Sequence, residues 1–223
     1  VFVLKLVAQG GLAFVGLLLA FAALYGNARL ALRGMERSAE SIVVLASGGI
    51  ATRAKFLVRV AQMLALPGTL FLAFLLALGL GSQWRTLIQA YFATPFGVVD
   101  PIFGRDVAHY VFAVPAWQML IDYVWAMTFL SLVLVALPIY FVRGDFEWRR
   151  GRLAIEAPAE LHLALLAALW LVLSALRTWV VGIPGLLSGT HGPLQGASWT
   201  DLHVRIPGMK ALVVGLVIAA VVL

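Results

Sequence analysis

Residues 116–142 read AWQMLIDYVWAMTFLSLVLVALPIYFV, an apolar stretch in which Asp122 is the one charged residue. A helix of about 20 such residues crosses the hydrocarbon core of a bilayer. Four further runs share this character, and lipid offers no partner to backbone N–H and C=O groups, so all five should be helical. The sequence therefore predicts an all-α integral membrane protein, a single polytopic bundle over residues 1–223. Its predicted spans are residues 6–25, 56–80, 116–142, 161–181 and 207–223.

The composition excludes a soluble domain. Hydrophobic residues make up 63% of the chain and charged residues 12%, against roughly 45–50% and about 25% in soluble domains. So few charges cannot cover a surface in water. The absence of cysteine excludes disulfides and thiolate metal sites. The net charge of +6 points in such a chain to membrane topology, and we expect no nucleic-acid partner.

Basic residues are unevenly distributed among the predicted loops. They gather in loops 26–55 and 143–157, while loops 81–115 and 182–206 carry few. The positive-inside rule then predicts that the first two loops are cytoplasmic and the other two lie outside. We expect a multi-pass protein of the cell membrane, with the first residues of this stretch extracytoplasmic. Because the chain starts with Val1 and stops within an apolar run, we also expect a segment of a longer protein.

The outer loop 81–115 is patterned and rich in aromatic residues, which suit the membrane interface. Asp100 followed by Pro101 is typical of a helix start, with an acidic cap and then proline at the first helical position. Asp106 is placed to cap a second short helix in which Tyr110 follows one turn later. We therefore predict one or two interfacial helices here. The candidate residues of this loop are Asp100, Pro101, Phe103, Gly104, Asp106 and Tyr110.

The outer loop 182–206 is rich in glycine and ends in a polar motif before Pro207. Serine and threonine ahead of an aspartate favour turns that cap the next element. The candidate residues of this loop are Gly196, Ser198, Thr200, Asp201 and His203.

Asp122 and Arg177 lie inside predicted spans, where an ionisable group costs about 2.5–3.5 kcal/mol on insertion scales. At 1.5 Å per residue, Asp122 is roughly 9 Å and Arg177 roughly 7 Å from the outer end of its span. These matched depths predict that the two side chains pair. Separate snorkelling of each group and a role in transport or proton relay are the alternatives.

Chemical signatures are sparse. The sequence shows no phosphate-binding glycine loop and no His-Glu-x-x-His or Gly-x-Ser-x-Gly motif. A haem site is excluded because His162, on the predicted cytoplasmic side, has no histidine at matched depth. We expect no cofactor and no metal. The weak candidates for an outer metal site are Asp100, Asp106 and Asp201, with His109, His191 and His203, although nothing in their spacing demands one.

Two motifs carry a family resemblance. Residues 100–115 read DPIFGRDVAHYVFAVP and residues 196–207 read GASWTDLHVRIP. In order and spacing they resemble uncharacterised protein family 0182, large multi-pass membrane proteins of bacteria and archaea. His109 stands where that family usually has Phe, and Trp199 where it usually has Tyr. The resemblance implies that this stretch supplies spans two to six and that a large extracytoplasmic region follows; it implies no activity.

These observations leave several functions open. The first is a membrane anchor or scaffold for a large extracytoplasmic domain absent from this stretch, with the lipid bilayer and that domain as partners. The second is a transporter or channel component, in which Asp122 and Arg177 line a path. The third is a membrane enzyme acting on lipid-linked substrates at the outer interface. Membership in a larger membrane complex is also open, and the sequence favours a non-enzymatic role.

Overall fold

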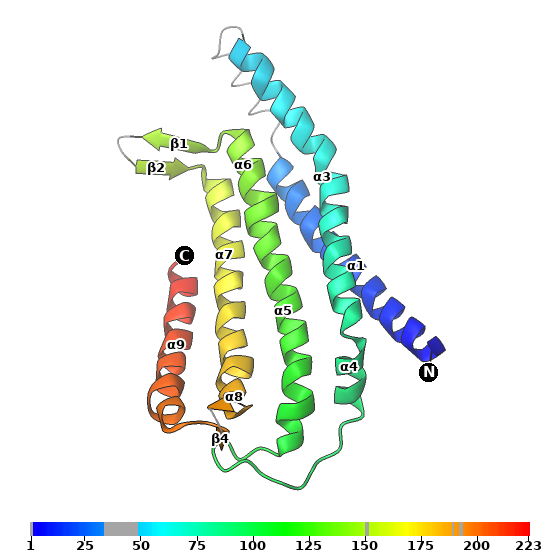
Figure 1. Ribbon diagram of the computed structural model, residues 1–223. Helices are drawn as coiled ribbons and strands as arrows, with labels where there is room; N and C mark the ends of the chain where they lie inside the picture. The colour runs from blue at the N-terminus through cyan, green and yellow to red at the C-terminus, as the bar shows by residue number, and fades with distance from the viewer. Residues whose placement is uncertain (1, 34–48, 150–151, 189, 192–193) are drawn as a thin grey trace. The chain divides into compact units, whose positions relative to one another are not determined.

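The computed structural model describes residues 2–33, 49–149, 152–188, 190–191 and 194–223. Five of its helices are long and apolar enough to cross a membrane. This confirms the predicted all-α, polytopic membrane fold (Figure 1). The five helical stretches are Lys5–Leu32, Arg59–Ser82, His109–Arg143, Ala157–Gly185 and Asp201–Val222.

The first two helices are longer than the apolar runs that predicted them. Helix α1 covers Phe2–Leu32 and α3 covers Gly49–Ser82. The chain therefore stays helical through residues 26–32, where the sequence predicts a loop. Within this continuation, the side-chain amide of Asn27 donates to the carbonyl of Ala23, four residues earlier, at 2.8 Å. The middle of the predicted loop, residues 34–48, lies outside the described residues.

The remaining spans alternate between α- and π-helical segments. The third consists of η1 (His109–Ala113), α5 (Val114–Leu130), η2 (Ser131–Ala136) and α6 (Leu137–Arg143). The fourth consists of α7 (Ala157–Arg177), η3 (Thr178–Gly182) and α8 (Ile183–Gly185). The fifth consists of η5 (Asp201–Arg205) and α9 (Ile206–Val222).

Each of these four π-helical turns has a proline two residues after its end. A proline within a helix lacks the N–H donor, and its ring clashes with the carbonyl four residues earlier. A π turn places an extra residue in the helix and lets the chain pass this obstacle. For this reason Pro115 and Pro207 do not mark the start of their spans, as the sequence suggested, but lie inside helices that begin earlier. The four prolines are Pro115, Pro138, Pro184 and Pro207.

The connections contain short elements. After α3, the chain forms a short helix, α4 (Trp84–Tyr91), which lies in loop 81–115 but before the predicted helix starts at Asp100 and Asp106. Strands β1 (Phe146–Arg149) and β2 (Arg152–Ile155) form an antiparallel hairpin between α6 and α7. A 3₁₀ turn, η4 (Leu186–Ser188), and a second hairpin of β3 (Thr190–His191) and β4 (Leu194–Gln195) precede η5.

The chain divides into two compact units. Unit one comprises Val1–Leu12, Leu80–Ala126 and Ala168–Leu223, and it contains both motif loops. Unit two comprises Ala13–Gly79 and Met127–Ala167. In unit two, Ala20, Leu24 and Ala28 recur every four residues along α1 and are fully buried, and the two small alanines allow close packing of this helix face.

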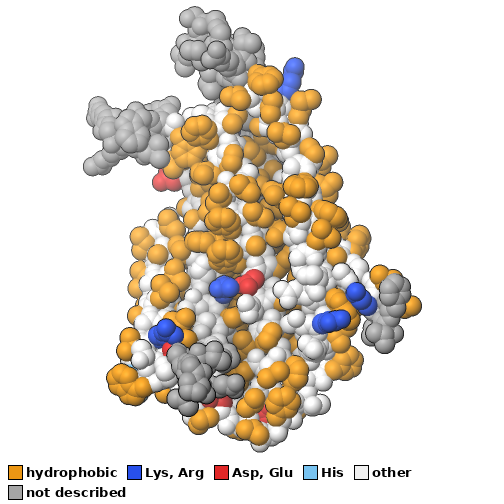
Figure 2. Space-filling view, in the orientation of Figure 1, with side chains coloured by type: hydrophobic (Ala, Val, Ile, Leu, Met, Phe, Trp, Pro, Cys, Tyr) orange, Lys and Arg blue, Asp and Glu red, His pale blue; other side chains and the backbone are white. Residues whose placement is uncertain are grey.

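Much of the hydrophobic surface is exposed. Large apolar side chains remain accessible along the spanning helices, and Figure 2 shows hydrophobic side chains over most of the face in view. Such a surface is unfavourable in water and suits contact with lipid.

Candidate functional site

The motif loop of unit one is shaped by two carboxylates. Asp100 is buried and accepts hydrogen bonds from the backbone N–H of Ile102 at 3.1 Å and of Phe103 at 2.6 Å. The chain then turns back through Gly104, whose φ of 67° favours glycine. Asp100 and Pro101 therefore close a tight turn and do not begin a helix, which corrects the prediction. The local reason is that the carboxylate bonds to the two N–H groups just beyond Pro101 and fixes a turn.

Asp106 holds the two sides of the same loop together. Its carboxylate accepts hydrogen bonds from the backbone N–H groups of Phe96 at 3.1 Å and Gly97 at 2.9 Å. It also accepts one from the backbone N–H of Ala108 at 2.8 Å, immediately before the third helical stretch begins at His109. Asp106 does act as a helix cap, but it caps the spanning helix itself rather than a separate short helix.

Tyr110 joins the turn to the spanning helix. Its hydroxyl donates to the carboxylate of Asp100 at 3.0 Å. The sequence suggested that Tyr110 belongs with Asp106, one helical turn away. The actual partner is ten residues distant, because the turn at residues 101–104 folds Asp100 back onto the helix.

Both carboxylates of this loop favour the ionised form. Burial raises the pKa of Asp100, but the hydrogen bonds from Phe103, Ile102 and Tyr110 outweigh it and hold the pKa below its ordinary value. The pKa of Asp106 is also lowered, first by the N–H of Ala108 and then by that of Phe96. Neither carboxylate is protonated near neutral pH, and each uses its charge to order backbone.

The second motif loop is built in the same way. Ser198 and Asp201 cap each other: the N–H and hydroxyl of Ser198 donate to the carboxylate, both at 2.8 Å, and the N–H of Asp201 donates to the Ser198 hydroxyl at 3.2 Å. This is a capping-box arrangement. Asp201 is fully buried and also accepts a hydrogen bond from Arg205 at 2.9 Å. Thr200 makes no side-chain capping bond.

The other candidates of this loop have local roles. His203 stacks on the exposed ring of Trp199, with the ring centroids 4.4 Å apart, and its Nδ1 lies 3.0 Å from the Trp199 carbonyl oxygen. Gly196 has a φ of 113°, which side-chain-bearing residues rarely adopt.

The candidate metal ligands are dispersed. Among the described residues, no three His, Asp or Glu side chains gather closely enough to hold a metal ion. The side chain of His191 lies outside the described part of the chain. The carboxylates of Asp100, Asp106 and Asp201 are instead hydrogen-bonded within their own loops.

Asp122 and Arg177 form the predicted ion pair. The Nε atom of Arg177 lies 2.5 Å from a carboxylate oxygen of Asp122, which joins the third and fourth helical stretches within unit one. Their side chains are 39% and 49% exposed. Nearby, Nε1 of Trp125 donates to the hydroxyl of Ser174 at 2.8 Å. Polar side chains on these two helices therefore satisfy each other across the interface.

Unit two contains a polar network that the sequence analysis missed. The side-chain amide of Asn27 donates to the hydroxyl of Ser131 at 3.2 Å, and its oxygen lies 2.9 Å from Nε2 of His162. The other ring nitrogen of His162 lies 2.8 Å from the hydroxyl of Tyr140. A neutral His162 with its proton on Nε2 satisfies both contacts, donating to Asn27 and accepting from Tyr140.

A buried cation lies next to this network. Arg143 is 8% exposed and pairs with Asp145 at 2.9 Å. It also donates to the carbonyl oxygens of Ala31 at 3.1 Å and Arg33 at 2.7 Å, and so ties the end of α6 to the end of α1. The signal in the sequence was weak: isolated polar residues at the ends of apolar runs, which resemble ordinary loop residues until their partners are known.

The ion pair between Asp122 and Arg177 predicts how exchanging the two charges changes the stability of the protein. Asp122→Arg or Arg177→Asp alone should lower stability by about 1–3 kcal/mol, since an unpaired ion in a span costs about 2.5–3.5 kcal/mol and partial exposure recovers some of that cost. The double swap should restore most of the loss. Thermal unfolding of the purified protein in detergent measures this, and a double variant as unstable as the sum of the singles would contradict it.

The loop carboxylates predict an acid-sensitive segment. Because the folded-state pKa values of Asp100 and Asp106 are lowered, their contribution is complete above the unfolded value of about 4. It is lost as pH falls through the folded values. Amide hydrogen exchange, corrected for intrinsic rates, should show residues 96–108 losing protection in acid. The Asp100→Asn/Asp106→Asn variant should be less protected at neutral pH and show little pH dependence.

Protection of residues 96–108 that is unchanged by acid in the native protein, or by the two substitutions at neutral pH, would show that the carboxylates do not hold the loop. The amides of residues 116–124, in the adjoining helix, serve as the internal control.

Comparisons with known proteins agree with the motifs. The chain is 34% identical over 173 residues to a UPF0182 protein of Cupriavidus necator, covering 78% of this chain and 18% of that protein. It is 31% identical to one of Desulforamulus reducens (70% and 18%) and 32% identical to one of Bradyrhizobium diazoefficiens (66% and 16%). The chain thus spans less than a fifth of the length of these relatives.

No solved structure matches the chain significantly. The profile of the Uncharacterised protein family (UPF0182) matches residues 1–223, the full stretch. The chain therefore belongs to the Uncharacterised protein family UPF0182.

Proposed function

We propose that this chain is a membrane anchor and scaffold whose two motif loops hold an extracytoplasmic domain of the same polypeptide at the cell membrane. The observation that carries the proposal is the use of the loop carboxylates. Asp100, Asp106 and Asp201 each order the backbone of their own loop. Carboxylates that bind backbone N–H groups in this way hold the loop in one conformation. In a metal-dependent enzyme, they would converge on a shared metal ion as its ligands.

The surfaces that these carboxylates shape are apolar and exposed. Phe96 is 50% exposed, Val98 60%, Val99 61% and Trp199 70%. Exposed aromatic and apolar side chains on an ordered loop are typical of contact surfaces. The relatives are more than five times longer than the segments they share with this chain. We therefore propose that the rest of a polypeptide of such length supplies the domain that these loops contact.

The scaffold requires a defined topology. The proposal places loops 81–115 and 182–206 outside the cell membrane, with loops 26–55 and 143–157 in the cytoplasm and the first residues of this stretch extracytoplasmic. The distribution of basic residues supports this orientation.

Cysteine labelling tests the topology. This stretch contains no cysteine, so single cysteines can be introduced at exposed positions once any elsewhere in the full protein are replaced. In intact cells, a membrane-impermeant maleimide should label Val98→Cys and Trp199→Cys. It should label Glu156→Cys only after the membrane is permeabilised. Labelling of Val98→Cys and Trp199→Cys from opposite sides would end the proposal.

Site-specific photo-crosslinking tests the scaffold. A photoreactive phenylalanine analogue at Phe96 or Trp199 of the full-length protein should form crosslinks to residues of the same polypeptide outside this 223-residue stretch. The matched control is Phe141, an apolar side chain that is 73% exposed on α6 of unit two and should give mainly lipid adducts. Only lipid adducts at all three positions would contradict the scaffold.

A transport role is the second candidate, and the network of Asn27, His162 and Tyr140 favours it. In the sequence, only Thr128 and Ser131 continue a line of polar side chains inward from Asp122 on the third span, which argues against a continuous aqueous path. The network adds three hydrogen-bonding side chains to unit two, and polar groups within spans often mark ion pathways. The test is ion flux across the membrane of proteoliposomes that contain the full-length protein. An ion flux that the His162→Ala substitution abolishes would favour transport over the scaffold.

A further inference from the structure

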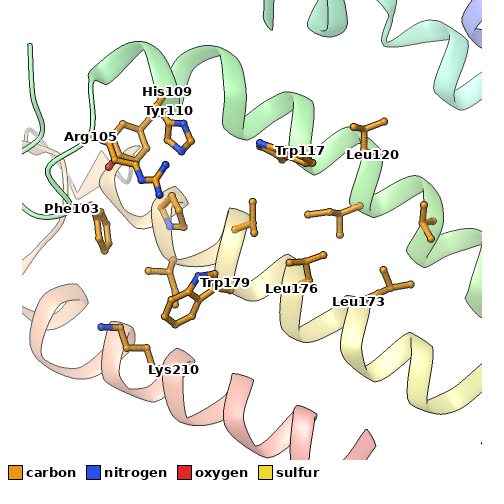
Figure 3. A pocket seen from close by; sticks show the side chains of 15 residues that line it. Phe103, Arg105, His109, Tyr110, Trp117, Leu120, Leu173, Leu176, Trp179 and Lys210 are labelled. Atoms are coloured by element: carbon orange, nitrogen blue, oxygen red, sulfur yellow. The ribbon is translucent and has the colours of Figure 1, made fainter. Parts of the chain in front are cut away.

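Unit one contains a groove that the proposed scaffold does not use. Its volume is about 690 Å³, and it lies along the η1–α5 segment, the α7–α8 segment and the start of α9 (Figure 3). Most of its wall is apolar. The side chains that form this wall include Trp117, Leu120, Val124, Leu173, Leu176 and Trp179.

The groove runs lengthwise along the helices. On α5 the wall extends from Trp117 to Val124, and on the fourth helical stretch from Leu173 to Ile183. At 1.5 Å per residue these are lengths of roughly 10 and 15 Å. Both segments belong to helices suited to crossing a membrane, so the long axis of the groove follows the direction of the lipid chains.

One end of the groove is positively charged. Figure 3 shows the side chains of Arg105 and Lys210 at the end where Phe103 lies, while Leu120 and Leu173 lie toward the other end. Both cations are exposed. Within the described part of the chain, neither forms an ion pair or a side-chain hydrogen bond.

Among the described residues, the carboxylates of the two motif loops form no ion pair with these cations. The carboxylate of Asp100 is hydrogen-bonded to its own turn and to Tyr110. That of Asp201 is paired with Arg205 and Ser198. His109 adds another polar side chain to the same end of the groove, so this end can accept a negatively charged group.

This combination selects the kind of occupant. A water-soluble anion would leave a long apolar wall without a partner, and an apolar protein helix would bury two cations without counter-charges, which is costly. An anionic lipid satisfies both parts of the groove. Cationic side chains at a membrane surface attract anionic headgroups, and an apolar channel accepts an alkyl chain through the hydrophobic effect.

We propose that this groove binds one anionic phospholipid of the bilayer. Its phosphate contacts Arg105 and Lys210, and one acyl chain lies along the wall between Trp117 and Leu176. The site goes beyond the scaffold role, because its ligand is a lipid of the bilayer and not a domain of the same polypeptide.

Native mass spectrometry of the full-length protein in detergent tests the site. Phosphatidylglycerol and phosphatidylcholine with the same acyl chains are titrated separately. The native protein should bind phosphatidylglycerol at least about tenfold more tightly. Arg105→Gln with Lys210→Gln should weaken phosphatidylglycerol binding by about tenfold or more, since each cation near the surface contributes roughly fivefold. Phosphatidylcholine binding should change little.

Two further variants separate the site from general charge effects. Lys5→Gln with Arg85→Gln removes the same charge from exposed positions of unit one outside the groove, and it should change lipid binding less than about twofold. Leu120→Trp, at a position 41% exposed in the groove, should fill the channel and weaken binding of both lipids.

Several results would overturn the proposal. They are equal affinity for the two lipids, an equal loss in both charge variants, and full binding by Leu120→Trp. Saturation by inorganic phosphate alone would show that the acyl chain has no part. Tighter binding of a polyprenyl phosphate than of phosphatidylglycerol would show that a lipid-linked phosphate is the ligand in place of a bilayer phospholipid. A failed scaffold test leaves these measurements unaffected.

Discussion

A polar group that enters the hydrocarbon core must find its partner within the protein, because lipid offers none. This constraint makes the backbone helical over five long stretches and brings polar side chains on neighbouring helices together. Arg177 meets Asp122 and Trp125 meets Ser174 in unit one, while Asn27, His162 and Tyr140 meet in unit two. The same constraint explains the proline-associated π turns, which carry the helices past residues that lack an N–H donor.

In the motif loops and at the start of the fifth helical stretch, carboxylates order the backbone. Asp100, Asp106 and Asp201 each bind backbone N–H groups within a few residues of their own position or across a short loop. A charged acceptor makes stronger hydrogen bonds than a neutral one, so a few such residues can order a segment with no regular secondary structure. The apolar side chains of these loops are thereby presented outward at fixed positions, which is the basis of the scaffold proposal.

The two units use charge in different ways. In unit two Arg143 is buried, paired with Asp145 and bonded to the end of α1; it fastens the ends of two helices. In unit one Arg105 and Lys210 are exposed at the end of an apolar groove. A buried cation with satisfied donors is a structural element, whereas exposed cations beside an apolar channel are available to an anionic ligand. This contrast separates Arg143, a structural residue, from Arg105 and Lys210, the two cations to which the lipid site is assigned.

The sequence by itself determined the membrane fold, the approximate spans and the pairing of Asp122 with Arg177, because hydropathy and depth along a helix are read directly from residue order. It also located both motif loops. Only the tertiary structure decided that Asp100 closes a turn and binds Tyr110, that helices continue through Pro115 and Pro207, and that His162 has partners. These outcomes depend on which side chains meet across helices or across a folded loop, and spacing along the chain does not specify such contacts.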